Sequence, residues 1–332
     1  MEPKKISIHD VANAAGVSIT TVSRVINKVP TVAEPNRRKV EEAIRQLKFS
    51  PSPYAQALAR GTVSNCLALI IPRYEGIFYS FYVLELIRGI GTLCDALHLD
   101  LLLHLTDGRG DFNYRSVAGI IFADIIGNRF QLEGALKAQT PTVMINNLVE
   151  DLEVSCIAVD NLQGAFDAVN YLLSLGHKRI AHIAGDQISQ AASLRLAGYR
   201  QALKERGIAE IPEYIIETDY SRGDARQAAE KLLSLKEPPT AIFIASDSMA
   251  LEAVTVIMEK GKKVPDDISI IGFDDNPSSL YGVVSLTTVR QPLIKMAEEG
   301  VKELNSLIQG KKELNKVKLP CELVIRDSCK AI

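Results

Sequence analysis

The sequence predicts an α/β protein with a small helical domain at its N-terminus, and three observations support this. Residues 7–27 have the pattern of a helix-turn-helix. Beyond residue 61, short apolar runs alternate with amphipathic helical stretches, which is typical of doubly wound domains with parallel sheets. The length of 332 residues and the apolar content of 47% are sufficient for about two or three domains with sizeable cores.

The first two helices are expected to be joined by a tight turn at Gly16. Ser7 and Asp10 form a capping box ahead of an apolar pattern, and Ser18 can cap the second helix. At roughly 100° per residue, the second helix has one apolar face and one polar face. Val22, Val25 and Ile26 lie on the apolar face, and Thr20, Arg24 and Asn27 lie on the polar face.

The polar face of the second helix predicts a surface that enters a DNA major groove. Arginine can donate two hydrogen bonds to guanine, whereas hydroxyl groups and helix N-terminal amides suit phosphate oxygens. Ile19 lies at the edge of the apolar face, so it could belong to the core or contact a base. The alternative is an ordinary solvated helical hairpin that binds no nucleic acid.

A third helix is expected at 33–47, and it would complete a three-helix domain over residues 1–49. Residues 50–63 contain two prolines followed by a run of good helix formers. That run is too short to be stable alone, because isolated helices below about 12 residues are marginal in water. We therefore expect residues 50–63 to form a hinge that becomes ordered only with a partner.

Charge is unevenly divided along the chain. Residues 1–60 contain ten Lys and Arg against five Asp and Glu, whereas the remainder contains 28 against 35. Only the N-terminal part is therefore suited to a polyanion, although so small an excess is also common on ordinary surfaces.

The five cysteines are scattered and lack the spacing of metal ligands, so they are expected to be free, mostly buried thiols of a reducing cytoplasm. The sequence shows no apolar signal-peptide segment and no apolar stretch approaching about 18 residues. A protein that is neither exported nor membrane-spanning is expected.

The larger part of the chain is expected to form two doubly wound units of about 120 residues each. Crossovers between them are expected near Asp160, near Thr288 and at the C-terminal strand. Strands are expected at 67–71, 101–104, 117–122, 142–146, 180–184, 241–245 and 268–273, and helices at 84–97, 131–137, 163–175, 193–206, 222–234, 248–260 and 293–308.

Polar residues stand at the carboxyl ends of three predicted strands, namely Asn146, Ser246 with Asp247, and Asp274 with Asp275. Ligands of open α/β sheets bind outside these strand ends. The arrangement suits a cleft between two lobes, in which carboxylates and amides bind the hydroxyls of a small polar molecule. Asp247 and Asp274 could instead cap the helix or turn that follows.

Aromatic residues gather where the first lobe would face that cleft. They could stack on a sugar ring, although packing in the core or at its rim is the commoner fate of such a cluster. They are Tyr74, Phe78, Tyr79, Phe81 and Tyr82.

Catalytic patterns are absent from the sequence. GxGxxG, GxxxxGK[ST], GxSxG and HExxH do not occur, and the five histidines are dispersed. We therefore expect a protein that is not an enzyme and that uses no cofactor or metal.

The chain resembles the lac repressor/galactose repressor family of bacterial transcription regulators. The resemblance covers nearly the whole length. Matching motifs include Asp10-Val11-Ala12, Gly16-Val17-Ser18, Thr21-Val22-Ser23-Arg24-Val25-Ile26-Asn27, Ala57-Leu58-Ala59, Leu196-Ala197-Gly198-Tyr199, Ser246-Asp247-Ser248-Met249-Ala250, Ile271-Gly272-Phe273-Asp274-Asp275 and Leu286-Thr287-Thr288-Val289-Arg290-Gln291-Pro292.

This resemblance implies a helix-turn-helix domain followed by a hinge and a two-lobed effector domain similar to periplasmic binding proteins, at 64–332. One lobe would comprise about 64–160 and 290–320, and the other about 161–288 and 321–332. Residues 106–117 are short and polar where similar proteins usually have a full helix.

The resemblance also implies roles for individual residues on DNA. It places Ile19 and Thr20 at specificity positions, Arg24 on a base, and Leu58 in the minor groove at the operator centre. A further set would contact mainly the DNA backbone, consisting of Ser18, Thr21, Ser23 and Asn27.

For the effector, the resemblance favours Asn146, Arg195, Asp274 and Gln291. It favours Ser246 less, because relatives often have a larger amide there. It also favours Ser193 less, because the lac repressor has an arginine at that position.

We therefore predict a cytoplasmic homodimer that binds double-stranded operator DNA and represses genes of carbohydrate metabolism. A sugar or sugar derivative bound between the lobes would control it allosterically. Two alternatives remain. One is a carbohydrate-binding module whose N-terminal head serves for docking or dimerisation, and the other is a regulator controlled by a phosphoprotein corepressor.

Overall fold

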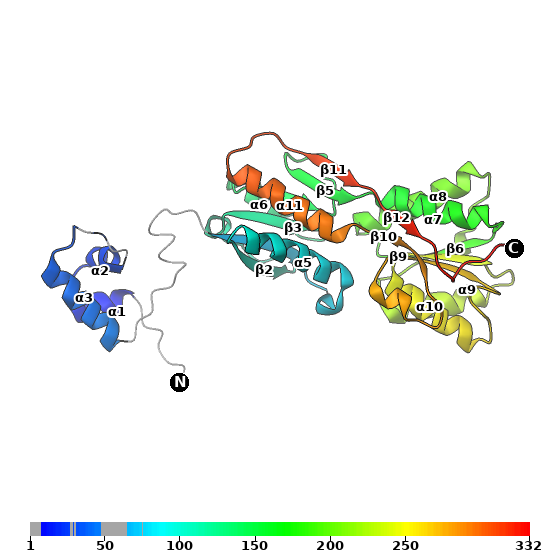
Figure 1. Ribbon diagram of the computed structural model, residues 1–332, viewed down its shortest axis with the longest axis horizontal. Helices are drawn as coiled ribbons and strands as arrows, with labels where there is room; N and C mark the ends of the chain where they lie inside the picture. The colour runs from blue at the N-terminus through cyan, green and yellow to red at the C-terminus, as the bar shows by residue number, and fades with distance from the viewer. Residues whose placement is uncertain (1–7, 27–28, 30, 48–64, 75) are drawn as a thin grey trace. The chain divides into compact units, whose positions relative to one another are not determined.

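The computed structural model describes residues 8–26, 29, 31–47, 65–74 and 76–332. The chain forms two compact units, a helical one at the N-terminus and a larger α/β one that ends at Ile332 (Figure 1). This is the predicted fold class. The predicted hinge at 50–63 lies outside the described residues, as do Ser7, Asn27 and Leu58.

The helical unit contains three helices packed around one small core. They are α1 (Ile8–Ala15), α2 (Ile19–Ile26) and α3 (Glu34–Gln46). Val11, Val22 and Val40, one from each helix, are fully buried. The predicted third helix is confirmed to within one residue at each end.

The first sheet of the α/β unit has six strands in the order β11-β5-β4-β3-β1-β2. Their bounds are β1 (Cys66–Pro72), β2 (Asp100–Thr106), β3 (Gly119–Ala123), β4 (Thr142–Ile145), β5 (Ser155–Val159) and β11 (Lys316–Leu319). β3 pairs in parallel with β1 and β4, and β5 pairs in parallel with β4 and β11. The helices of this lobe are α5 (Phe81–Ala96), α6 (Arg129–Lys137) and α11 (Leu293–Ile308).

Glycine allows α5 and α11 to approach each other closely. A Cβ atom added to Gly89 of α5 would lie 2.8 Å from the Cβ of Ala297 and 2.9 Å from the carbonyl oxygen of Ile294. Any larger residue at position 89 would therefore separate the two helices. Leu86 and Ile90, which flank this contact on α5, are fully buried.

The second sheet also has six strands, in the order β12-β10-β9-β8-β6-β7. Their bounds are β6 (Ile180–Ala184), β7 (Ile215–Glu217), β8 (Ala241–Ile244), β9 (Ser269–Asp274), β10 (Thr287–Arg290) and β12 (Glu322–Val324). The pairing of β12 with β10 is antiparallel, whereas the other pairs are parallel. The prediction of parallel sheets is therefore wrong for this edge strand.

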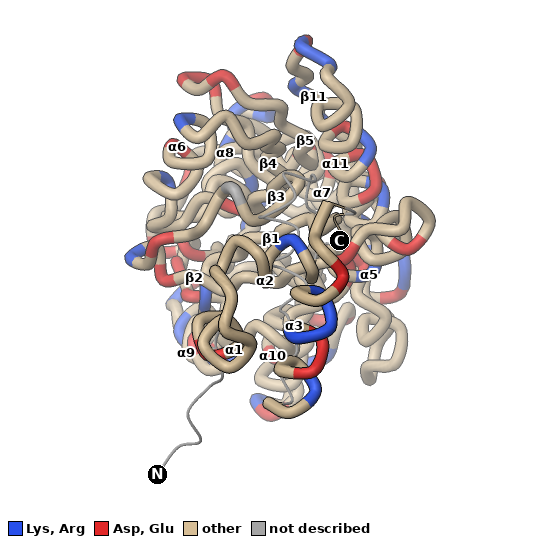
Figure 2. The backbone as a smooth tube through the Cα atoms, turned by 90° about the vertical axis from the view of Figure 1, so that its left-hand side faces the viewer, with Lys and Arg blue, Asp and Glu red and all other residues tan. Residues whose placement is uncertain are grey.

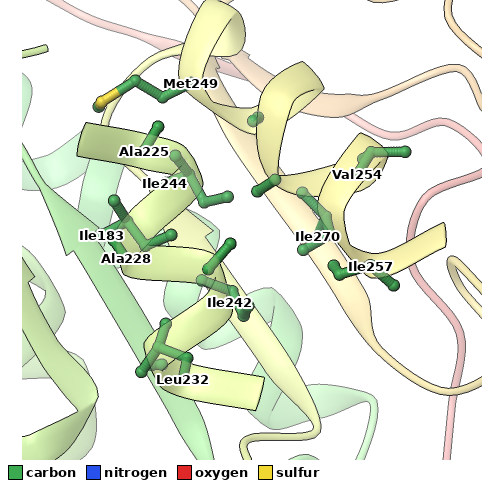
Figure 3. Close-up of a cluster of buried hydrophobic side chains, with 14 of the residues drawn as sticks. Ile183, Ala225, Ala228, Leu232, Ile242, Ile244, Met249, Val254, Ile257 and Ile270 are labelled. Atoms are coloured by element: carbon green, nitrogen blue, oxygen red, sulfur yellow. The ribbon is translucent and has the colours of Figure 1, made fainter. Parts of the chain in front are cut away.

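Helices cover both faces of the second sheet because its strands are apolar on both sides. Ile242 and Ile244 of β8 pack against α9 (Arg222–Leu233) and α10 (Asp247–Glu259), as Figure 3 shows. Ala241 and Phe243 of the same strand point the other way, toward α7 (Asn161–Ser174) and α8 (Gln190–Glu205). The alternation follows from the two-residue period of a strand.

Several elements are longer than predicted or were missed. α5 begins at Phe81 rather than at residue 84, because the Ser80 hydroxyl accepts a hydrogen bond from the Val83 amide and caps the helix there. β5, β7 and β10 were not expected as separate strands. The segment 106–117, which lacks a full helix, contains only a short 3-10 turn at Tyr114–Ser116.

None of the five cysteines, all of which lie in described residues, forms a disulfide, as expected. Cys94 and Cys156 are buried, whereas Cys66, Cys321 and Cys329 are half-buried, so the prediction of mostly buried thiols is wrong for three of them. Within the described part of the chain, no helix is both long enough and apolar enough to cross a bilayer.

Candidate functional site

The first candidate site is the exposed face of α2, and the turn before this helix determines its position. Gly16 has a φ of 63°, a left-handed conformation that glycine adopts without strain. The Ser18 hydroxyl then accepts a hydrogen bond from the Thr21 amide at 3.2 Å and caps α2, as predicted. Val22 and Val25 hold the helix against the core.

The outward face of α2 carries the side chains that the sequence predicted for DNA. Ser18, Thr20 and Arg24 are exposed. Ile19 is 40% exposed, so it belongs to this surface rather than to the core. Two more predicted residues, Thr21 and Ser23, are half-buried at the edges of the face.

Charge distinguishes α2 from α3. The Arg24 guanidinium forms no ion pair with any described residue, whereas Arg38 and Arg45 of α3 pair with Glu34 and Glu42. Figure 2 shows basic and acidic positions alternating along α3. The basic charge of α3 is therefore largely compensated within the helix, and Arg24 remains available to a ligand.

The second candidate site lies at the carboxyl ends of the strands in the α/β unit. In the first lobe, Asp124 follows β3 and Asn146 follows β4, with φ angles of 69° and 67°. Asn146 Nδ2 donates a hydrogen bond to Asp124 Oδ1 at 2.7 Å. Burial raises the pKa of the Asp124 carboxyl above its usual value.

Two buried polar atoms near this pair have no hydrogen-bond partner within the described residues. They are Asn146 Oδ1 and the hydroxyl oxygen of Tyr82. Burial and the neighbouring Asp124 charge raise the pKa of Tyr82 well above 10. An unpaired buried polar group costs about 1–3 kcal/mol, so such atoms are the natural places for a ligand to bind.

In the second lobe, Arg195 of α8 is 4% exposed. Its Nε donates to Asn161 Oδ1 at 2.8 Å and its Nη1 donates to the Ala245 carbonyl at 2.6 Å. The guanidinium also lies over the ring of Phe273, 3.8 Å from its centre. These contacts hold the side chain in one orientation and leave Nη2 without a hydrogen bond to the described residues.

Asp274, at the end of β9, accepts a hydrogen bond from Gln291 Nε2 at 2.6 Å. Burial raises the pKa of Asp274 to about 6, against the opposing effect of the Arg195 charge. Asp247 is also fully buried, but Asn276 N and Thr288 Oγ1 donate to its two oxygens at 2.7 and 2.6 Å. The Asp247 carboxyl therefore does not cap the helix that follows it, but connects the loop after β9 to Thr288 of β10 (Thr287–Arg290).

The two lobes come together around these side chains. The Arg195 charge opposes the rise in the pKa of Asp124, which belongs to the opposite lobe. Burial raises the pKa of Tyr220; the Arg195 charge opposes this effect, and the charges of Asp274 and Asp124 add to it. Gln190 bridges the lobes directly, since its Oε1 accepts from Leu148 N at 2.7 Å and its Nε2 donates to Leu148 O at 2.9 Å. Side chains of both lobes therefore meet at the candidate site.

The structure brings together four of the six effector residues that the resemblance favoured. Asn146, Asp274 and Gln291 lie at strand ends, and Arg195 lies on α8, from where its charge acts on Asp274. The Ser246 hydroxyl is occupied at the N-terminus of α10, where it accepts from Met249 N at 3.4 Å. Ser193 is exposed on α8, and its side chain makes no hydrogen bond to a described residue.

Three residues at this site were missed by sequence reasoning. Asp124 follows β3, as Asn146 follows β4, but the predicted strand ends at residue 122, one residue before β3 itself ends. Tyr82 was considered only as part of an aromatic cluster. Tyr220 belongs to the loop before α9 and gave no signal in the sequence.

The aromatic cluster at 74–82 is not a packed core. Tyr74 is 46% exposed, Phe78 62% and Tyr79 92%. Burial raises the pKa of Tyr74, and the charges of Asp124 and Asp274 add to this effect, so Tyr74 lies near the site. Stacking of an aromatic side chain on a ligand stays a prediction. No group of metal-binding side chains occurs in the described ranges.

Comparison with known proteins gives two family matches. The model for bacterial regulatory proteins of the lacI family matches residues 7–52, and the model for a periplasmic binding protein-like domain matches residues 169–329. The HTH-type transcriptional regulator DegA of Bacillus subtilis (strain 168) is 37% identical, with 98% of each chain covered.

Two solved structures are similar over almost their whole length. The complex of the transcriptional regulator CelR with cellobiose has a TM-score of 0.74 and 27% identity, covering 97% of this chain and 99% of the other. The lac repressor dimer bound to operator and the anti-inducer ONPF has a TM-score of 0.73 and 29% identity, covering 99% and 100%. These relatives are transcription regulators, in agreement with the expectation that the chain is not an enzyme.

Proposed function

The chain belongs to the lacI family of bacterial regulatory proteins and is a DNA-binding transcription regulator; from this premise we propose that it represses genes of carbohydrate metabolism under the control of a sugar-like effector. The effector binds between the two lobes of the α/β unit. The protein acts in the cytoplasm as a homodimer.

The observation that carries the DNA-binding part of the proposal is the outward face of α2. Thr20 and Arg24 are exposed there beside Ile19, and Arg24 has no ion-pair partner among the residues described. We propose that Arg24 hydrogen-bonds a base, that Ile19 and Thr20 set specificity, and that Ser18 binds the DNA backbone. Three further residues would contact the backbone in the same way, namely Thr21, Ser23 and Asn27.

One helix-turn-helix makes few base contacts, so two copies on a near-palindromic operator are expected. The lac repressor relative was solved as a dimer on its operator, which supports this assembly. We propose that Leu58 of the hinge enters the minor groove at the operator centre. Such a wedge unstacks a base step at a cost of a few kcal/mol, which additional DNA contacts offset.

The effector part rests on the space between the lobes. Arg195 and Asp274 provide a donor and an acceptor from the second lobe, Asn146 provides an acceptor from the first, and Gln291 holds Asp274. Clefts of this kind bind small polar molecules through a few well-placed polar groups. The CelR relative, solved with cellobiose, supports a saccharide ligand.

Selection from random double-stranded DNA tests the proposal. The full-length protein should enrich a near-palindromic sequence, and its affinity for that sequence should fall steeply with salt, because bound phosphates release counterions. Failure to enrich any sequence would favour the head as a docking or dimerisation unit. If DNA binding responds only when a phosphorylated protein is added, and not to any sugar, the phosphoprotein-controlled regulator is the correct alternative.

A further inference from the structure

We infer that the space between the lobes selects an uncharged or positively charged ligand rich in hydrogen-bond donors, such as a neutral sugar, an amino sugar or a nucleoside, and rejects sugar acids and sugar phosphates. This inference rests on the proposed function, because it names the chemical class of the effector. Three observations carry it.

The first observation is the balance of charge at the site. Asp124 from the first lobe and Asp274 from the second both border the site. Asp186 is a third negative charge, and it adds to the rise in the pKa of Tyr220. Within the described part of the chain, Arg195 is the cation found among these groups. A bound anion would therefore meet more negative than positive charge.

The second observation is that Arg195 is already engaged. Its Nε and Nη1 are used by Asn161 Oδ1 and the Ala245 carbonyl, and one face of the guanidinium lies on Phe273. Bidentate recognition of a carboxylate or phosphate needs two adjacent guanidinium nitrogens. The Nε edge is therefore closed to an anion, and the donors that remain are the two N–H bonds of Nη2 and the second N–H bond of Nη1.

The third observation is the surplus of acceptor atoms. Asn146 is 7% exposed, its Nδ2 is committed to Asp124, and its Oδ1 is buried without a partner among the described residues. Asp274 accepts a side-chain hydrogen bond through Oδ1, and its Oδ2 atom has no side-chain donor among the described residues. Acceptors of this kind are satisfied by hydroxyl or ammonium donors of a ligand.

Asp247 is not part of this surplus. Both of its oxygens accept hydrogen bonds within the second lobe, from Asn276 N and Thr288 Oγ1. Burial raises the pKa of Asp124 and of Asp274, and the Arg195 charge only partly opposes this effect. Hydrogen-bond donors or an ammonium group of a ligand would stabilise these carboxylates, whereas an anion would not.

The test is a binding panel with the full-length protein. Neutral sugars, amino sugars and nucleosides are each paired with their own acid or phosphate, and binding is measured by thermal shift and then by calorimetry. At least one neutral or basic member is expected to bind, and its anionic counterpart should bind at least tenfold more weakly. An acid or phosphate that binds as tightly as its parent compound overturns the inference.

The same panel separates this inference from the proposed function. If only anionic members bind, and they alter operator affinity, the chain is still an effector-controlled repressor and the inferred ligand class is wrong. If neither the neutral and basic members nor the anionic ones bind, both the inference and the effector part of the proposed function fail.

Asp124→Asn tests the electrostatic origin of the selectivity. Asparagine keeps an oxygen that can accept from Asn146 Nδ2 but removes the negative charge. The ratio of affinities between a neutral ligand and its acid should fall at least threefold. Asp95→Asn, on the exposed end of α5, makes the same charge change away from the site and should leave the ratio unaltered. An unaltered ratio in Asp124→Asn refutes the inference.

Discussion

The guanidinium of Arg195 lies 3.8 Å from the centre of the Phe273 ring, so a residue in the middle of α8 is held against the end of β9. The ring removes one face of the cation from water, and Asn161 and Ala245 fix two of its nitrogens. Arg195 is therefore oriented before any ligand arrives. Preorganisation of this kind reduces the entropy lost on binding.

Replacement of Arg195 by lysine should lower ligand affinity by about 5- to 30-fold. Lysine keeps the charge but loses the planar fork and its stacking on Phe273, at a cost of about 1–2 kcal/mol. Calorimetry with the best ligand of the panel measures the loss. Arg200→Lys is the matched control, because Arg200 lies on the same helix, is exposed and pairs with Glu210. Equal losses in both variants would remove Arg195 from the proposed role.

Arg24→Ala should weaken operator binding by about 1–3 kcal/mol and relax the preference at one base position. The reason is the loss of two hydrogen bonds to a base edge. Repeating the DNA selection with the variant measures both effects. Arg45→Ala, on the exposed surface of α3, should leave the selected sequence unaltered. A selected sequence that stays the same in Arg24→Ala would show that this side chain does not read a base.

His182 should make the α/β unit sensitive to acid. The imidazole is fully buried, its Nδ1 bonds the Phe243 carbonyl at 3.0 Å, and its ring stacks on Phe243 with 4.7 Å between centroids. Burial lowers the pKa of His182 to about 4, whereas the unfolded value is 6.5. The unfolded chain binds the proton first, so this contribution to stability is complete above about pH 6.5 and is lost as the pH falls toward 4.

Denaturant unfolding of wild type and His182→Phe at pH 7 and pH 4 measures this effect. Wild type should lose up to about 3 kcal/mol more than the variant between the two pH values, because one pKa unit corresponds to about 1.4 kcal/mol. Parallel losses would mean that His182 does not titrate as its burial implies.

Asp274→Asn should stabilise the ligand-free protein at neutral pH. The pKa of Asp274 is raised to about 6, so the folded state holds this proton more tightly than the unfolded state. Its contribution to stability is complete below about pH 4 and declines as the pH rises through 6. Asparagine can still accept from Gln291 and carries no charge.

Thermal unfolding of the variant between pH 4 and pH 8 provides the measurement. The variant should gain up to about 3 kcal/mol over wild type above pH 6 and nothing near pH 4. Ligand affinity should fall in the same variant. A gain that does not depend on pH would contradict the assignment.

Leu58→Gly should weaken operator binding while ligand affinity stays the same. The variant removes the apolar wedge proposed for the minor groove. Gel-shift and calorimetric titrations of the same preparation compare the two activities. Losses of similar size in both assays would argue against a residue dedicated to DNA.

The sequence predicted most of the fold because its signals were local. Ser18 capped the second helix as expected, and apolar runs located the long buried strands. The short edge strand β7 was not visible, since three residues contain too little alternation to be distinguished from a loop.

Residues of the candidate site could be predicted from the sequence alone only where they follow a strand. Asn146 and Asp274 were found because each follows a strand, whereas Arg195 was found through resemblance alone. The contacts that make Arg195 a ligand candidate come from Asn161 and Ala245, which lie 34 and 50 residues away in sequence. No local pattern reports such contacts. The role of Tyr220 likewise depends on how the loop before α9 folds back toward the cleft.

Coupling between the two candidate sites tests the central claim most directly. The dissociation constant for the selected operator is measured with and without a saturating ligand from the panel, in wild type and in Arg195→Lys. The ligand should change operator affinity of wild type by about 5- to 150-fold, which corresponds to a coupling of about 1–3 kcal/mol. Arg195→Lys should bind the operator like ligand-free wild type and respond only weakly. If a ligand that binds between the lobes leaves operator affinity unaltered in wild type, the chain is not regulated as proposed.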